Sequence, residues 1–588
     1  MNYKWKLEPP TPEKLEAAER LAKELNISPI LGRLLIERNI TTVADAKKFF
    51  RPSLTELYDP FMFTDMDKAV ERLNKALGRK ERIMVYGDYD VDGCTAVALV
   101  YKFLQQYYSN IDYYIPDRYE EGYGVSVKGI DYAYESGVKL IIVLDCGIKA
   151  IEKIEYAKQL GIDFIICDHH MPDDTLPDAV AVLDAKRVDS VYPYEHLSGC
   201  GVGFKFMQAF AKSNNFPFAD LEKLLELTAV SIASDIVPLV DENRILAHYG
   251  LLRLNASPSK GLLSIIKICG LDRHNITIDD IVFKIGPRIN AAGRMRMDEN
   301  DENAAPSGGY AAVNLLIEGN ESLAEEFGSV IDGFNQDRKC IDRSVTQEAH
   351  DFIEAHAELK AAKSTVIYNP RWMKGIVGIV ASRLIETYYR PTVVLTMSNG
   401  FVTGSARSVP GFDLYQAIES CSDLLENFGG HMYAAGLTMR PERVEEFTRR
   451  FNAYVEENID PITLQPQVEI DSELFFSNIP PAFRRDLNRF QPFGPGNPAP
   501  VFVTRGVVSH GETKLVGADC EHLRMDLMQR QKPNTTIQTI AFQQPTHYEW
   551  IRAGHPIDVC YQIVENHYRG TVTTQLRIKD IKPLRSKQ

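Results

Sequence analysis

An apolar run that leads directly into three alternating carboxylates constrains this chain more than any other stretch. Residues 83–87 are typical of a buried β-strand, and Asp88, Asp90 and Asp92 follow before Gly93. An apolar helix is predicted immediately afterwards, so the carboxylates lie where a strand passes into a helix. Carboxylates gathered at the carboxyl end of a strand are typical of sites for hard cations. The alternative is an acidic turn that binds no metal.

The same alternation of strand and helix continues to about residue 240. Strands are predicted at 82–86, 111–115, 140–144, 164–167 and 179–183, with helices at 95–107 and 150–160. Near-continuous apolar strands separated by helices predict a parallel sheet that is covered on both faces. Ligand sites in such sheets lie at the carboxyl ends of the strands.

Polar residues follow several of these predicted elements. Asp145 ends the third strand, Asp168-His169-His170 ends the fourth, and Asp235 follows an apolar helix. A single aspartate in such a place often caps a helix, and either histidine can be a core or capping residue. Several converging carboxylates, however, repel one another unless cations lie between them. Carboxylates with imidazole suit Mn²⁺, Mg²⁺ or Zn²⁺, and the absence of nearby cysteine pairs disfavours zinc.

Bulk properties limit the class of protein. The chain has 588 residues, which at roughly 100–200 residues per domain predicts three or four domains. We see neither an apolar run of the roughly 20 residues that span a bilayer nor a secretory signal. Nine cysteines without a CxxC pair favour reduced thiols, so we expect a cytoplasmic protein without membrane attachment. The net charge of −14 argues against a nucleic-acid coat protein but not against an enzyme with a basic channel.

The ordered motifs resemble those of the DHH phosphoesterase superfamily, and most of all its RecJ branch. The resemblance is carried by Asp88 to Gly93, Asp145-Cys146-Gly147, Asp168-His169-His170, Ser234-Asp235, and residues 286–295, 375–384, 404–408 and 429–431. It implies an α/β protein in which a parallel-sheet DHH lobe is joined by a long helix to a smaller α/β DHHA1 lobe. A C-terminal β-barrel of the OB-fold type would follow.

We expect five segments on this basis. They are an N-terminal helical lead (1–64), the DHH domain (65–300), an acidic loop with the long connecting helix (301–358), the DHHA1 domain (359–458) and an OB-fold-like domain (467–586). Apolar residues at spacings of 3, 4 and 7 predict the long helix, with a possible kink near Gly333. Short strands at 501–504, 537–542, 557–564 and 572–578 are typical of a small barrel.

The resemblance also implies roles at the metal site. Asp88 and Asp90 would ligate two Mn²⁺ or Mg²⁺ ions, Asp145 would bridge the ions, and His169 and Asp235 would complete the second site. Two metal ions that share a carboxylate are the usual arrangement for phosphoester hydrolysis. The superfamily spacing leaves Asp92 without a ligand role.

Catalytic roles fall to His170, Asp145 and Asp168 by the same resemblance. His170 would contact the scissile phosphate or donate a proton. Arg118 and His196 are polar residues near the same face, and we expect no catalytic role for either.

Residues expected to bind nucleic acid lie in two places, around Arg288 and Arg294 and in the DHHA1 lobe. Arg288 and Arg294 flank small residues, and arginine suits bidentate phosphate contact, although a surface arginine pair is the alternative. In the DHHA1 lobe the resemblance assigns phosphate or nucleic-acid contact to Ser405, Arg407, Gly430 and His431. The residues around Gly430 are expected to form a loop.

Two features depart from the family pattern. Met373 occupies a position where a histidine is expected, and a thioether neither donates a hydrogen bond nor carries charge. Residues 298–309 form an acidic, Gly/Pro/Ser-containing segment beside Arg294, which is typical of a surface loop.

The expected function is a 5′→3′ exonuclease that hydrolyses single-stranded DNA to 5′-mononucleotides in DNA repair and recombination. Direction and strand preference come from the resemblance alone, as do possible helicase and single-strand-binding-protein partners. One alternative is a DHH phosphodiesterase acting on short oligonucleotides or cyclic dinucleotides. Another, motivated by Met373 and the acidic segment, is a catalytically weakened single-strand-binding protein.

Overall fold

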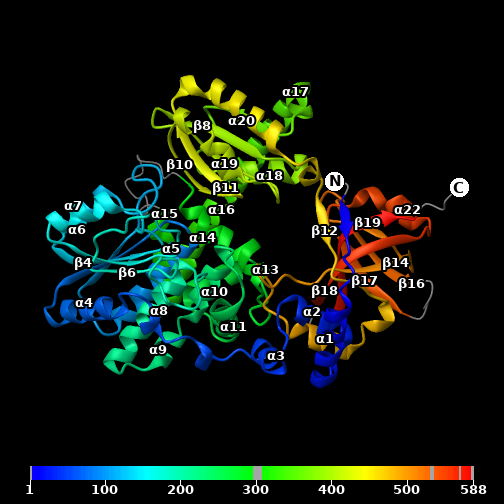
Figure 1. Cartoon of the computed structure of the whole chain (residues 1–588), viewed down its shortest axis with the longest axis horizontal. Helices are drawn as coiled ribbons and strands as arrows, with labels where there is room; N and C mark the ends of the chain where they lie inside the picture. Colours follow the sequence, from blue (N-terminus) through cyan, green and yellow to red (C-terminus); the bar gives the residue numbers. More distant parts are fainter. Residues whose placement is uncertain (1–2, 296–307, 530–534, 569–570, 585–588) are drawn as a thin grey trace.

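The computed structural model describes residues 3–295, 308–529, 535–568 and 571–584 in three domains arranged around a central helix (Figure 1). The DHH lobe lies at the lower left in Figure 1, the DHHA1 lobe above it, and the C-terminal barrel at the right. The acidic segment 298–307 lies outside the described residues. No helix in the described ranges is long and apolar enough to cross a bilayer.

The DHH lobe is built on a five-stranded parallel sheet, as the sequence predicted. The strand order is β3 (Ile111–Tyr114), β2 (Arg82–Gly87), β4 (Val138–Leu144), β5 (Asp163–Cys167) and β6 (Ala181–Leu183). Alternate residues of β2 belong to two different apolar clusters, Val85 with α5 (Val91–Gln105) and Met84 with α6 (Val127–Glu135). Helices therefore cover both faces of the sheet, and its carboxyl edge is the place where ligand sites form in such sheets.

The central helix, α16 (Glu321–Ala355), is continuous for 35 residues and passes through Gly333 without interruption. It packs against α14 (Gly286–Ala292) of the DHH lobe and α18 (Val377–Tyr388) of the DHHA1 lobe. Ion pairs fix both contacts, Arg288 with Asp332 at 2.8 Å and Arg383 with Asp342 at 2.7 Å. The helix thus sets the spacing of the two lobes.

The DHHA1 lobe contains a mixed five-stranded sheet. Its order is β10 (Leu425–His431), β11 (Ala434–Met439), β9 (Phe401–Arg407), β8 (Thr392–Ser398) and β7 (Thr365–Tyr368). The expected loop around Gly430 is wrong, because these residues end strand β10. Gly430 pairs with Ala435 at φ 147°, and a Cβ there would lie 2.3 Å from the carbonyl oxygen of Ala434. Gly430 therefore serves the close approach of two strands rather than a turn.

The C-terminal domain is a barrel that shares its core with the start of the chain. Seven strands pair in the order β13-β14-β18-β19-β17-β16-β15, and an additional β14–β16 pairing closes the sheet. Their bounds are β13 (Ser472–Glu473), β14 (Phe502–Ser509), β15 (Lys514–Val516), β16 (His522–Gln529), β17 (Thr536–Ala541), β18 (Ile557–Tyr568) and β19 (Thr571–Pro583).

The N-terminal segment is helical but is not a separate lead. Helices α1 (Pro12–Leu25), α2 (Pro29–Glu37) and α3 (Val43–Phe50) bury Leu34 and Leu35 in the same cluster as barrel residues such as Leu527. Strand β1 (Lys4–Lys6) also pairs in parallel with β12 (Gln467–Glu469), more than 460 residues later. Each of these helices has one apolar face, and the barrel supplies the surface that buries it.

One arginine joins the DHH lobe to the C-terminal domain. Arg244, on α11 (Asp241–Ala256), is buried and its guanidinium group lies 3.8 Å from the ring centre of Phe49. It donates hydrogen bonds to the carbonyl oxygens of Phe49, Arg489, Phe490, Gln491 and Pro492. Planar guanidinium groups can satisfy many acceptors at once, which makes this residue the clamp between the domains.

We expect Arg244→Ala to destabilise the protein by roughly 3 kcal/mol, since hydrogen bonds from charged groups contribute about 1.5–3 kcal/mol each. Differential scanning calorimetry would show a lower melting temperature. The matched control is Arg79→Ala, whose side chain is 64% exposed. Equal melting temperatures for the two variants would contradict the clamp.

Candidate metal centre and nucleic-acid cleft

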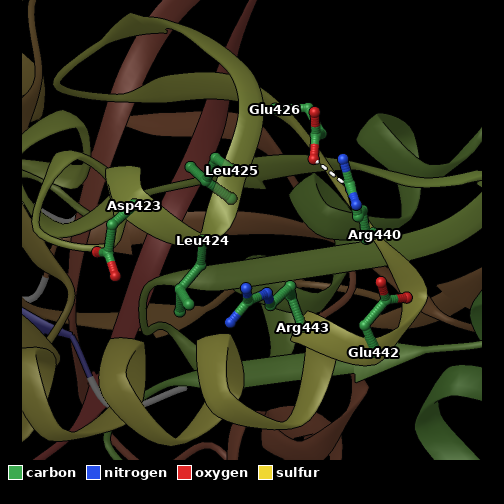
Figure 2. Close-up of a pocket in the computed structure, with 7 residues that line it drawn as sticks. All are labelled: Asp423, Leu424, Leu425, Glu426, Arg440, Glu442 and Arg443. Carbon is green, nitrogen blue, oxygen red and sulfur yellow. Dashed lines mark hydrogen bonds and ion pairs between the residues drawn. The ribbon is translucent and has the colours of Figure 1, made fainter.

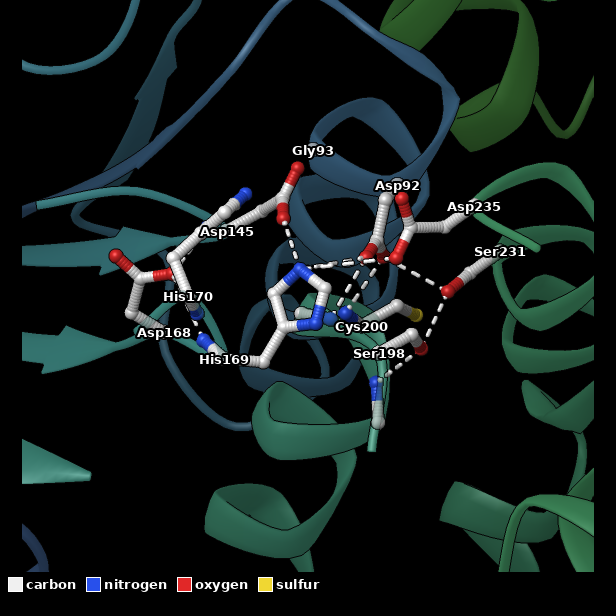
Figure 3. Close-up of polar contacts among 12 residues, drawn as sticks. Asp92, Gly93, Asp145, Asp168, His169, His170, Ser198, Cys200, Ser231 and Asp235 are labelled. Carbon is white, nitrogen blue, oxygen red and sulfur yellow. Dashed lines mark hydrogen bonds and ion pairs between the residues drawn. The ribbon is translucent and has the colours of Figure 1, made fainter. Parts of the chain in front are cut away.

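The polar residues singled out in the DHH lobe converge at the carboxyl edge of its sheet (Figure 3). Strand β2 leads to Asp88, β4 to Asp145 and β5 to Asp168-His169-His170. Asp235 is the C-cap residue that follows α10 (Leu225–Ser234). Figure 3 shows the His169 ring between Asp145 on one side and Asp92 with Asp235 on the other.

Asp145 and His169 form the centre of this cluster. Nε2 of His169 lies 3.1 Å from Oδ1 of Asp145, and both residues are buried. Asp145 has φ 61°, a left-handed conformation that is uncommon for a residue with a side chain. A Cβ on Gly199 would lie 2.6 Å from the Cβ of Asp145, so the glycine makes room for it. Strain held in place by close packing is typical of functional sites.

Asp92, which the motif spacing left out, also belongs to the cluster. Its Oδ2 and that of Asp235 each lie 3.7 Å from Nε2 of His169, and ligand atoms of the three residues fall within 4.8 Å of one another. Asp92 accepts hydrogen bonds from the backbone N–H groups of Gly199 and Cys200 at 2.7 and 2.8 Å. These groups begin helix α8 (Gly199–Asn214), whose N-terminus favours negative charge.

Nothing near Asp92 in the sequence reveals this contact. Ser231 donates to its carboxylate at 2.7 Å from a helix 139 residues away. The one usable signal was its place as the third alternating carboxylate.

Asp88 and Asp90 lie beside the cluster and are partly engaged by the backbone. Asp88 is buried and accepts from the N–H of Gly124 at 3.3 Å, while Asp90 caps α5 by accepting from the N–H of Gly93 at 3.0 Å. Within the described ranges, neither joins the groups whose ligand atoms lie within 4.8 Å. Their assignment as ligands therefore stays a prediction.

Each carboxylate of the cluster alters the pKa of its neighbours. Burial, and then Asp92, Asp90, Asp235 and Asp88, raise the pKa of Asp145 well above its usual value. Burial and Asp90 likewise raise the pKa of Asp88 to about 8. Burial and the neighbouring His170 lower the pKa of His169 to about 3, which leaves its imidazole neutral. Crowded carboxylates with a neutral imidazole are a donor set that fits Mn²⁺ or Mg²⁺.

His170 and Asp168 form a separate pair beside the cluster. Nδ1 of His170 lies 2.8 Å from Oδ1 of Asp168, which also accepts from two backbone N–H groups. Partial burial disfavours the imidazolium, but the hydrogen bond and charge of Asp168 outweigh it and raise the pKa of His170 to about 9. The His170 side chain is about half exposed, and Asp168 holds its Nδ1.

Arg294 lies between the two lobes, next to this acidic edge. Its guanidinium donates to the carbonyl oxygen of Gly375 at 3.1 Å, and its own carbonyl accepts from the Tyr119 hydroxyl at 2.6 Å. Burial, and then the charges of Arg118, Arg407 and nearby Arg338, lower the pKa of Arg294 to about 9, whereas Asp90 raises it. Within the described ranges no carboxylate lies within ion-pair distance of Arg294. Converging cations without such a partner are typical of a phosphate site.

Arg407 and Ser405 face this cleft from the DHHA1 lobe. The Arg407 guanidinium donates to Oγ of Ser405 at 2.8 Å, and its positive charge, after burial, lowers the pKa of exposed His431. Strand pairing brings Gly430 to the same region, because β11 lies between β9 and β10. The structure therefore groups all four DHHA1 residues that the sequence selected.

Arg288 lies elsewhere. Its Nε pairs with Asp332 of α16, and its Nη1 donates to the carbonyl oxygen of Lys284 at 2.8 Å. This side chain contacts the connecting helix α16. The structure gives no support for the phosphate contact that the sequence predicted for Arg288. Arg118, by contrast, lies 4.9 Å from the ring centre of Tyr89 and is one of the cations that surround Arg294.

Two further features lie outside the site. Met373, where the family pattern has histidine, packs against the apolar cluster that contains buried Trp372. A cavity of about 360 Å³ in the DHHA1 lobe (Figure 2) is lined by Asp423, Leu424, Leu425, Glu426, Arg440, Glu442 and Arg443. Arg440 pairs with Glu426 there at 2.8 Å, and no residue of the metal cluster lines it.

We expect Gly199→Ala to weaken divalent-cation binding, because the added methyl group would displace Asp145. Loss of a positioning contact of this kind typically costs roughly 10–100-fold in metal affinity. Isothermal calorimetry with Mn²⁺ would measure it. The matched control is Gly201→Ala on the same helix, whose Cβ would meet nothing closer than 3.4 Å. Equal affinities for both variants would contradict the steric role of Gly199.

Comparison with known proteins identifies the same three domains. The model of the DHH family N-terminal domain matches residues 82–232, the DHHA1 domain model residues 361–457, and the RecJ OB domain model residues 470–580. The single-stranded-DNA-specific exonuclease RecJ of Bacillus subtilis is 34% identical, over 98% of this chain and 70% of that protein. The protein of the same name from Escherichia coli is 31% identical, over 95% of this chain and 96% of that protein.

The crystal structure of RecJ from Thermus thermophilus in complex with Mn²⁺ has the same architecture. It superposes with a TM-score of 0.81 at 25% identity and covers 99% of this chain and 80% of that one. With domain models in this order and relatives of this identity along nearly its whole length, the chain belongs to the RecJ family of DHH proteins.

Proposed function

We propose that this protein is a metal-dependent 5′→3′ exonuclease that hydrolyses single-stranded DNA to 5′-mononucleotides. The observation that carries the proposal is the proximity of two oppositely charged sites, close enough for Asp90 to influence the pKa of Arg294. A buried cluster of carboxylates around Asp145 and His169 lies directly beside the cationic cleft of Arg294, whose pKa responds to Asp90. Relatives named as single-stranded-DNA-specific exonucleases, and a Mn²⁺-bound one among the solved structures, support this reading.

In this proposal Asp145, His169, Asp235 and Asp92 hold two Mn²⁺ or Mg²⁺ ions, with Asp88 and Asp90 completing the ligand set. Bound divalent cations supply activation of a water molecule and neutralise charge on the phosphate oxygens. Asp145, whose pKa is raised by Asp92, Asp90, Asp235 and Asp88, would contribute its carboxylate to this ligand set.

The other side chains orient the strand and move a proton. Protonated His170, held by Asp168, donates to the phosphate or to the oxygen that leaves it. Arg294, Arg118 and Arg407 hold the phosphate backbone between the lobes. In this proposal the protein acts in DNA repair and recombination. Its partners there are a helicase and a single-strand-binding protein.

The alternatives have less support. A catalytically weakened binding protein would not need five crowded carboxylates around a neutral imidazole, a combination that is costly unless cations are held. Short oligonucleotides or cyclic dinucleotides would not need the C-terminal barrel (Figure 1).

The direct test is to incubate 5′-phosphorylated single-stranded DNA with Mn²⁺, with and without chelator. We expect release of mononucleotides that chelator abolishes. Asp145→Ala should reduce the rate by more than the roughly 100-fold that loss of an outer-shell partner costs, with an unchanged circular dichroism spectrum. A strand that is bound but not shortened would sink the proposal. Cleavage of dinucleotides alone would favour the second alternative.

A pair of arginine variants tests the cleft. We expect Arg294→Gln to weaken binding of single-stranded DNA by about 10-fold and to lower the salt dependence by about one charge. Arg79→Gln, at an arginine whose side chain is 64% exposed, should leave both quantities near wild type. Fluorescence anisotropy at several salt concentrations, in the presence of chelator, gives the two slopes. Equal slopes for the two variants would count against the phosphate role of Arg294.

A further inference from the structure

The turn that joins β10 to β11 carries two side chains that are unusual for a turn of its length. His431 pairs with Ala434, so Met432 and Tyr433 form a two-residue hairpin loop. Such loops favour Asn-Gly or another glycine pair, because their preferred conformations need positive φ. Neither Met432 nor Tyr433 has positive φ. A local rule that is broken in this way is typical of a functional site.

Core packing does not explain the two side chains. Met432 is 39% exposed and Tyr433 is 45% exposed, and neither belongs to the apolar cluster of the DHHA1 lobe. Leaving apolar side chains in water forgoes the free energy that their burial supplies. The fold itself therefore gives no reason for this pair, whereas a ligand that covers it does.

The backbone of the turn is held at three points. The N–H of Leu414 donates to the carbonyl oxygen of Met432 at 3.1 Å. The N–H of Ser408 donates to the carbonyl oxygen of Tyr433 at 3.0 Å, and the N–H of Tyr433 donates to Nδ1 of His431 at 3.3 Å. A side chain on a fixed backbone loses less conformational entropy when it binds a partner.

A cation of the nucleic-acid cleft lies on the neighbouring strand. Ala434, the residue after Tyr433, pairs with Arg407 of β9. The Arg407 guanidinium donates to Oγ of Ser405, and within the described ranges it forms no ion pair. Its charge is one of those that lower the pKa of Arg294. An exposed aromatic ring next to a cation without a carboxylate partner is the combination by which proteins bind single strands.

We propose that Tyr433, flanked by Met432, is a stacking platform for a base of the bound strand, next to the phosphate that Arg407 holds. Every base has an aromatic face, so this contact adds affinity without reading sequence. The guanidinium beside the ring selects an occupant with negative charge and flat rings, which single-stranded DNA provides, over an apolar protein surface. The inference rests on the proposed function, because it names a contact by which the same cleft holds its strand.

A thermodynamic cycle between the tyrosine ring and the bases of the strand tests the inference. Fluorescence anisotropy in chelator compares a single-stranded oligonucleotide with a strand of the same length in which every nucleotide is abasic. We expect Tyr433→Ala to weaken binding of the normal strand by about 10-fold, the loss typical of one stacked base. The abasic strand should bind both proteins equally, because it offers no base to stack. Tyr433→Phe should match the wild type, since stacking needs the ring and not the hydroxyl.

The salt dependence of binding separates stacking from phosphate contact. The slope of log affinity against log salt reports the number of phosphates that are neutralised, so Tyr433→Ala should keep the wild-type slope while affinity falls. Tyr134→Ala, which removes an exposed tyrosine from α6, is the control and should change neither quantity. Circular dichroism checks folding. If the alanine variant does not fold, Tyr433→Leu keeps an apolar side chain without a ring and gives the same comparison.

Three results would overturn the inference. They are an unchanged affinity of Tyr433→Ala for the normal strand, which would leave the pair as a contact for a protein, an equal loss on the normal and abasic strands, and a reduced salt slope. If the wild type releases mononucleotides and one of these results is found, the inference alone is wrong. If the wild type binds no single-stranded DNA, the proposed function falls with it.

Discussion

Mutual repulsion among the buried carboxylates around Asp145 is the constraint to which the rest of the DHH lobe responds. Burial and neighbouring charges raise the pKa values of Asp145, Asp88 and Asp92, so these groups resist ionisation together. The N-terminus of α8 and the hydroxyl of Ser231 offset part of this cost at Asp92 through hydrogen bonds. Bound divalent cations would offset the rest of this repulsion. Without them, keeping all of these carboxylates ionised is unfavourable.

Opposite charge lies immediately across the cleft. Arg294 and Arg118 belong to the DHH lobe and Arg407 to the DHHA1 lobe, and α16 joins the two lobes through ion pairs with Arg288 and Arg383. The loop that carries Tyr119 and Tyr123 spans the same gap and reaches both the DHHA1 lobe and His170. The carboxylate cluster, the arginines around Arg294 and the side chain of His170 are thus parts of one junction, and movement of either lobe would disturb all of them.

Much of the fold was predictable because local patterns dominate it. Apolar strands alternate with helices over the DHH lobe, and all five strands appear where that pattern places them. Predictions failed where partners came from remote segments. The residues around Gly430 were expected to form a loop, but they pair with strand β11. The sequence indicated a helical N-terminal lead but not its partner, and the barrel built after residue 467 buries the apolar faces of helices α1 to α3.

For the site itself, the sequence determined the residue types and their positions at strand ends, because register and element order bring Asp145, His169 and Asp235 to one edge. Only the tertiary structure decided which side chains meet. Asp92 belongs to the cluster because α8 and α10 pack over it and donate hydrogen bonds to it. Arg288 instead pairs with Asp332, on a helix more than 40 residues away. Tyr433 lies beside Arg407 because β11 pairs with β9. Contacts of this kind depend on the packing of distant elements, and spacing along the chain carries no record of them.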